Sequence, residues 1–210
     1  MTKTITRLFD SYQDASKAVT ELEQLGIRHD DLSIMANKGV GDHGDAGDHA
    51  VTDVNDHGDV SRGVSTGAVV GGVGGLLAGL GLLAIPGLGP IVAAGWLAST
   101  VAGAGLGAAG GAATGGIVGA LKEAGHSDDD AQVYAEGVRR GGTLVSARVP
   151  DDLETQAEAV LQRNRSVDAT TRGSAYRESG WSSYDQTAPA YSQDEMAGER
   201  DRYASANTVI

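Results

Sequence analysis

A charge-free stretch with a regular glycine period constrains this chain more than any other feature. Residues 63–121 contain no Asp, Glu, Lys or Arg. Two runs of small residues lie within this stretch at a spacing of four, and Ser99 takes one place in the second run. The glycines of the two runs are Gly63, Gly67, Gly71, Gly75 and Gly79, then Gly95, Gly103, Gly107, Gly111, Gly115 and Gly119. On a helix this spacing forms a stripe without side chains, which lets a second helix approach closely.

A short segment between the two runs predicts a turn. A helix cannot continue through two prolines and two glycines placed so close together. We therefore predict a helical hairpin over residues 63–121, with helices over 63–84 and 91–121. The first helix would be about 33 Å long, enough to cross a hydrocarbon core of about 30 Å. The turn residues are Pro86, Gly87, Gly89 and Pro90.

Three interpretations of this glycine-zipper hairpin remain open. Each glycine costs a helix in water roughly 1 kcal/mol, so the helices need close packing, lipid or both. We favour self-association combined with membrane association, in which the hairpin keeps both flanking segments on one side of the bilayer. The same stripe could instead pack helices within a soluble oligomer. A linker without structure is the third interpretation, and the regular period argues against it.

The segment before the insertion predicts a strand, a helix and a second strand within residues 1–37. The first strand covers Thr4–Phe9, where β-branched and apolar residues gather. Ser11 is placed to cap a helix that ends at Gly26, and apolar residues within it follow helical spacing. The second strand covers Asp31–Ala36.

The segment after the insertion, residues 126–171, repeats this pattern behind an extra helix. Ser127 is placed to cap that helix, and Gly141 to end it. The alternation of Thr143–Val149 predicts a strand, and a helix opens at Pro150. A weak last strand is expected over Ser166–Thr171. Together the two segments predict an α+β domain with the split β-α-β pattern of ferredoxin-like folds.

Composition excludes several classes of function. The formal net charge of -12 disfavours nucleic acid, because phosphate contacts need clustered Lys and Arg. It also disfavours electrostatic docking on anionic lipid, so any lipid contact has to be apolar. The chain has no cysteine, which excludes disulfides, thiolate catalysis and Cys-ligated metals. No apolar run follows Lys3, so we expect no secretory signal and a location in the cytoplasm, at the inner face of the cytoplasmic membrane.

Residues 38–62 and 172–210 are expected to lack regular structure. The first segment is rich in Gly, Asp and His, and its histidines are His43, His49 and His57. Such residues can ligate zinc or nickel, but nothing there pre-organises a site, so we read it as an acidic spacer and predict no metal. The second segment is rich in Ser, Tyr, Asp and Gln and is predicted to be a disordered tail.

Catalysis finds little support in the sequence. No nucleophile elbow, phosphate loop or paired acidic motif occurs with its expected context. The remaining histidines, His29 and His126, flank predicted helix ends, where capping or solvation is the common role. We therefore predict no catalytic residues, no cofactor and no small-molecule substrate.

The chain resembles bacterial general stress proteins of the heat-induced, YflT-like family. Three stretches carry the resemblance: TITRLFDSYQDASKAVTELEQLGI, LLAGLGLLAIPGLGPIVAAGWLAS and YAEGVRRGGTLVSARV. It covers roughly residues 3–165 and implies a ferredoxin-like domain, induction under stress and no catalytic residues. The expected function is thus that of a non-enzymatic stress protein that self-associates and contacts membrane lipid. The alternative is a small-molecule-sensing regulatory domain of ferredoxin-like type, in which the hairpin serves soluble oligomerisation.

Overall fold

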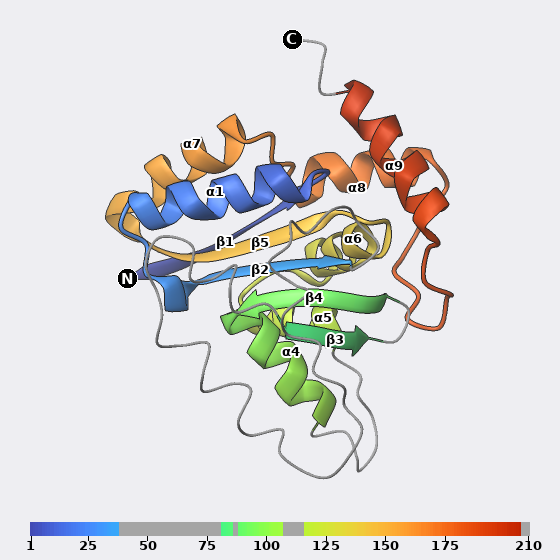
Figure 1. Ribbon diagram of the computed structural model, residues 1–210, viewed down its shortest axis with the longest axis horizontal. Helices are drawn as coiled ribbons and strands as arrows, with labels where there is room; N and C mark the ends of the chain where they lie inside the picture. The colour runs from blue at the N-terminus through green and yellow to red at the C-terminus, as the bar shows by residue number, and fades with distance from the viewer. Residues whose placement is uncertain (38–80, 86–87, 107–115, 207–210) are drawn as a thin grey trace.

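The protein is a mixed α+β molecule built around one antiparallel sheet, as a computed structural model shows (Figure 1). The structure describes residues 1–37, 81–85, 88–106 and 116–206. The sheet has five strands in the order β1-β5-β2-β4-β3. Their bounds are β1 (Thr2–Phe9), β2 (Leu32–Asn37), β3 (Gly81–Ile85), β4 (Gly89–Gly95) and β5 (Thr143–Pro150).

Helices cover both faces of this sheet (Figure 1). One face carries α1 and α7, and the other carries α4, α5, α6 and α8. Two short 3-10 turns, η1 (His29–Asp31) and η3 (Asp151–Leu153), precede β2 and α7. The helix bounds are α1 (Tyr12–Gln24), α4 (Trp96–Leu106), α5 (Gly116–Glu123), α6 (Asp128–Arg139), α7 (Glu154–Arg163), α8 (Ala169–Glu178) and α9 (Gln193–Ala206).

Local signals in the sequence account for the first helix and the first long helix after the insertion. The Ser11 hydroxyl accepts a hydrogen bond from the Asp14 amide at 3.4 Å, and Ser127 accepts one from the Asp130 amide at 3.1 Å. Both caps satisfy amides that have no partner within their helices. The chain leaves α1 through Gly26, whose φ of +100° suits a residue without a Cβ. These helix predictions are confirmed.

The strand predicted over Thr143–Val149 is also confirmed, and its alternation decides how the core divides. Val145, Ala147 and Val149 are fully buried against α1 and α7. Leu144 faces the opposite way and joins the core under α6. β5 lies between β1 and β2 and pairs antiparallel with both, so β1 and β2 run parallel to each other. Both faces of β5 are therefore buried, except at Arg148.

The predicted helical hairpin is wrong for the residues nearest its turn. Residues 81–85 and 89–95 form strands β3 and β4, which pair with each other, and β4 also pairs with β2. The second helix begins at Trp96 instead of Ile91. The physical reason is that β2 presents backbone donors and acceptors along its outer edge, and these need partners. Strand pairing supplies them, which overrides the helical spacing of the apolar residues.

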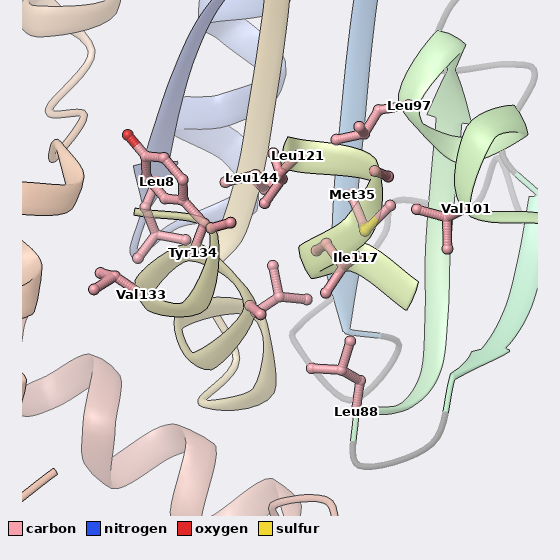
Figure 2. Close-up of a cluster of buried hydrophobic side chains, with 14 of the residues drawn as sticks. Leu8, Met35, Leu88, Leu97, Val101, Ile117, Leu121, Val133, Tyr134 and Leu144 are labelled. Carbon is pink, nitrogen blue, oxygen red and sulfur yellow. The ribbon is translucent and has the colours of Figure 1, made fainter. Parts of the chain in front are cut away.

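The apolar side chains around the turn complete the domain's own core. Leu88 and Ile91 are fully buried, and Leu97 and Ile117 are almost as well enclosed. Figure 2 shows Leu88, Leu97, Val101 and Ile117 converging with Met35 and Leu144 of the sheet. Within the described ranges, no helix is both long enough and apolar enough to cross a membrane.

The weak strand predicted over Ser166–Thr171 is reduced to one residue. Val167 bridges Leu8 of β1 through two backbone hydrogen bonds, of 2.9 and 2.7 Å, and α8 begins two residues later. Asp168 caps that helix by accepting from the Thr171 amide at 2.7 Å. The cap starts a helix where a strand would have continued.

The disordered tail predicted for residues 172–210 is not confirmed. Its part up to residue 206 contains most of α8 and all of α9. Arg172, Tyr176 and Met196 are all at most 3% exposed, because α8 and α9 pack against the domain. Aromatic and arginine side chains scattered among small polar residues were enough to anchor these helices.

Candidate functional site

A hollow with chemically varied walls follows the outer edge of β1. It has a volume of about 240 Å³, and its floor is formed by β1 from Lys3 to Arg7. The α6 side contributes His126, Asp130 and Tyr134, and the opposite side contributes Glu158 of α7. Residues 168–170, at the start of α8, close one end. We call this hollow the β1 groove.

The backbone of β1 is open along part of this groove. Leu8 directs both its N–H and its C=O away from β5, because both bond to Val167. Pairing between β1 and β5 is continuous from Thr2 to Phe9, so outward-facing residues alternate without interruption. Thr2, Thr4 and Thr6 therefore also direct their backbone groups outward.

Among these outward groups, the Thr6 carbonyl is the one that side chains of the described residues cap. The Tyr134 hydroxyl donates to it at 2.7 Å, and the Arg7 guanidinium donates at 3.0 Å. Thr4 is half-buried and Thr2 is exposed. In the described part of the chain, the Leu8–Val167 bridge is the one backbone pairing on this side of β1. The edge is thus open at Thr2 and Thr4.

Side-chain hydrogen bonds form a polar network on the α6 side of the groove. The Thr6 hydroxyl lies 2.7 Å from Nε2 of His126 and 2.5 Å from the Ser146 hydroxyl. The rings of His126 and Tyr134 meet edge to face at a centroid distance of 5.8 Å. Burial lowers the pKa of His126 below its ordinary value, so the imidazole is neutral at pH 7. Burial also raises the pKa of Tyr134 to about 12, which keeps its hydroxyl a donor.

Charges along the groove are only partly balanced. Lys3 forms an ion pair with Glu154, and Arg7 forms one with Glu158 at 3.3 Å, so the two cations are neutralised from the α7 side. Asp130 and Asp168 line the opposite wall and the closed end, and neither forms an ion pair with another described residue. The uncompensated charge of the groove is therefore negative.

A second cluster of charged and aromatic groups holds the tail. The Arg172 guanidinium donates to both carboxylate oxygens of Asp10 at 2.7 Å and lies 4.2 Å from the Tyr203 ring centroid. Arg140 pairs with Glu136 and with Glu199 of α9, at 2.7 and 2.9 Å. The space left among these groups is about 10 Å³, which is close to one water molecule. This cluster is filled by the chain itself.

The structure places few of the predicted helix-packing glycines. Gly95 ends β4, with a φ of +88°. A Cβ there would lie 2.1 Å from the Leu32 carbonyl oxygen, so this glycine allows close approach of β2, not of a second helix. Gly103 lies in α4, and Gly119 lies in α5, where a Cβ would meet nothing within 4 Å among the described residues. Gly63, Gly67, Gly71, Gly75, Gly79, Gly107, Gly111 and Gly115 lie outside the described residues.

The predicted turn lies between two antiparallel elements, but these are the strands β3 and β4 and not two helices. Gly89 and Pro90 begin β4, and Leu88 immediately before them is fully buried. The Leu88 carbonyl accepts a hydrogen bond from the Asn37 side chain at 2.7 Å. Pro86 and Gly87 lie outside the described residues.

No metal site emerges from the part of the chain that the structure describes, where no group of three or more His, Asp or Glu side chains is arranged to hold an ion. Residues 38–62, with the Asp/His repeats, fall outside that part. Asp128, Asp129 and Asp130 form the first turn of α6, where carboxylates complement the helix dipole.

Sequence reasoning missed the β1 groove. From the sequence, His126 is expected at a helix end, Tyr134 on the apolar face of a helix and Thr6 within a strand, with no role at a site for any of them. One signal was present: threonine at positions 2, 4 and 6 gives β1 a polar face, which is unusual beside an apolar core. The partners that this face meets come from residues about 120 positions away, so their meeting depends on the fold.

Comparisons with family models, curated protein sequences and solved structures found no match for this chain.

Proposed function

We propose that this chain is a non-enzymatic stress protein that acts as a binding module and associates with itself. The observation that carries the proposal is the β1 groove, where an open strand edge, a neutral imidazole and uncompensated carboxylates line one hollow of about 240 Å³. Such a site offers recognition through hydrogen bonds and charge. The link to stress rests on the family resemblance of residues 3–165.

Binding fits the groove better than catalysis does. The Thr6 hydroxyl lies beside His126, as a nucleophile would, but Thr6 is only 1% exposed and also bonds to Ser146. A substrate carbonyl needs to reach within about 3 Å of an attacking oxygen. Tyr134 is likewise occupied, because its hydroxyl caps the Thr6 carbonyl. These contacts support a role in holding the groove's shape.

The sheet order also supports the ferredoxin-like relationship as part of this proposal. β1, α1 and β2 form one split β-α-β unit, because β5 lies between the two parallel strands. β5, α7 and Val167 form a shorter second unit, with β1 between its ends. Two interleaved units of this kind define the ferredoxin-like arrangement. In this proposal its last strand is reduced to the Leu8–Val167 bridge.

Self-association is assigned to the glycine runs of the insertion. Their period of four favours close packing of backbones, whether between helices of one chain or of two. The apolar side chains of residues 88–101 and 117–121 are largely used in the domain's own core, which explains part of the charge-free stretch without lipid. We therefore place soluble self-association ahead of membrane contact.

The self-association is tested by sedimentation velocity on the full chain. We expect species larger than a monomer, and a smaller mass for the double variant Gly71→Leu with Gly107→Leu, because leucine side chains would separate the packed backbones. Gly198→Leu is the matched control, since a Cβ at this α9 position meets nothing within 4 Å among the described residues. A monomeric wild-type chain would refute self-association. Flotation with uncharged phosphatidylcholine vesicles distinguishes soluble self-association from membrane contact. A chain that floats with the vesicles contacts lipid, and an oligomer that remains at the bottom of the gradient associates without lipid.

A small-molecule sensor is the second candidate, and the mixture of hydrogen-bonding and charged side chains around the groove favours it. Typical small-molecule sites measure about 300–1,000 Å³, and the β1 groove is slightly smaller than the lower end of that range. A thermal-shift screen of small polar compounds tests this candidate, because a ligand bound only to the folded state raises the unfolding temperature. A compound that stabilises the wild type but not Asp130→Asn would support a sensor.

A further inference from the structure

Five consecutive residues of β1 form the floor of the groove, which therefore runs along the strand. Side chains of Lys3 and Arg7 reach one face of the sheet, where they pair with α7 residues. Thr6 reaches the other face, where it contacts His126 and Ser146. The groove thus lies at the very edge of the sheet, with α7 on one side and α6 on the other. Backbone N–H and C=O groups of β1 follow one another along the length of the groove.

An extended polypeptide fits this edge. The outward backbone groups of Thr2 and Thr4 are an N–H and a C=O at each residue, spaced as a partner strand requires. Val167 already pairs with β1 at Leu8 in the antiparallel sense, and α8 takes the chain away immediately afterwards. The place that a longer strand would have filled is the groove. A strand supplied by another protein would complete the pairing.

The charge of the groove selects among such partners. Lys3 and Arg7 are already paired, whereas Asp130 and Asp168 face the groove with no cationic partner among the described residues. An incoming segment with a lysine or arginine side chain would supply that partner. Because the whole chain carries a net charge of -12, a cationic segment would also be attracted from a distance.

We propose that the β1 groove binds an extended, cationic polypeptide segment of a partner protein, which adds to the sheet as a strand beside Thr2 and Thr4. This inference rests on the proposed function as a binding module and names its partner class. Backbone hydrogen bonds give the affinity, and the Asp130 and Asp168 carboxylates give the preference for a positive side chain.

Fluorescence polarisation with the full chain and a short labelled probe peptide tests this inference. The probe alternates threonine and valine around one central lysine, and its control carries N-methyl groups on alternate residues, which remove the pairing N–H donors. We expect the control to bind at least about tenfold more weakly, which corresponds to about 1.4 kcal/mol. Equal binding of the two peptides would overturn strand addition, since side chains alone would then explain the affinity.

Two pairs of protein variants locate the binding. Thr4→Pro removes an N–H that faces outward, a position where edge strands tolerate proline, and Thr4→Val keeps that N–H. We expect Thr4→Pro to lose binding and Thr4→Val to keep it. Asp130→Asn should lower the affinity for the lysine probe. It should leave the affinity for an analogue with norleucine in place of lysine unchanged. Retained binding in Thr4→Pro would place the peptide elsewhere and overturn the assignment.

Amide hydrogen exchange provides a measurement that does not depend on any variant folding. The probe peptide should slow exchange at Thr4, whose amide faces outward, and leave Ile5 unchanged, because the Ile5 amide already faces β5. No protection at Thr4 with saturating peptide would refute the inference. If free lysine amide binds with the same affinity as the peptide, strand addition fails while the groove remains a binding site, so the two proposals fail separately.

Discussion

Two glycines of the same predicted stripe have different physical roles. Gly95 has a φ of +88°, and a Cβ there would also lie 2.7 Å from the Ser33 Cα. Both the backbone conformation and the space therefore require glycine. Gly119 lies within α5, where a Cβ would have open space among the described residues. At the scale of single residues, the period of four does not by itself reveal which glycines are needed.

Replacing each of these glycines with alanine should give opposite results. Gly95→Ala is expected to lower the free energy of unfolding by at least about 3 kcal/mol, because β2 and β4 would have to move apart. Gly119→Ala is expected to raise it by up to about 1 kcal/mol, since alanine favours the helix. Urea denaturation followed by circular dichroism measures both. A Gly95→Ala chain as stable as the wild type would contradict the close approach that we describe.

The burial of His126 predicts how stability depends on pH. Its pKa is lowered in the folded state by burial, although the nearby Asp130 carboxylate opposes this and Arg7 adds to it. The unfolded chain therefore binds the proton first as the pH falls through about 6.5. The contribution of neutral His126 to the free energy of unfolding is fully present above that pH. It decreases as the pH falls from there to the folded-state pKa. Urea midpoints measured between about pH 7.5 and 5.5 should fall, and His126→Gln should reduce the slope.

At the scale of elements, α9 is held by a small number of strong contacts. Tyr203 lies over Arg172 and meets Tyr176 edge to face at a centroid distance of 6.0 Å. Glu199 pairs with Arg140, and both are at most 9% exposed. Met196 is buried as well, whereas the residues at 193–195, 198 and 201–202 are exposed. A helix anchored in this way opens more easily than the sheet does.

Tyr203→Ala should loosen α9 without unfolding the sheet. We expect amide exchange in α9 to become about tenfold faster, because the stacking on Arg172 is lost. Amides of β5 should keep their wild-type exchange rates. Asp194→Ala, an exposed change on the same helix, is the control. Faster exchange in β5 as well would mean that α9 and the sheet open together.

At the scale of the whole molecule, net charge opposes self-association. Copies that each carry a charge of -12 repel one another over about 10 Å at 0.1 M salt, and higher salt shortens that range. We therefore expect sedimentation at about 0.3 M sodium chloride to give more oligomer than at about 0.02 M. A smaller oligomer at high salt would indicate that ion pairs, not backbone packing, join the copies.

Elements with local signals can be predicted from the amino-acid sequence alone. Ser11 and Ser127 cap helices because their hydroxyls reach amides three residues on, and the alternation of Thr143–Val149 requires a strand with two different faces. The strands at residues 81–85 and 89–95, in contrast, depend on contacts with the rest of the fold. Their glycine and apolar spacing suits a helix, but the open edge of β2 offers backbone partners that an isolated segment never meets. The β1 groove has the same origin, since it exists because Val167 pairs with β1 at one residue and then turns away.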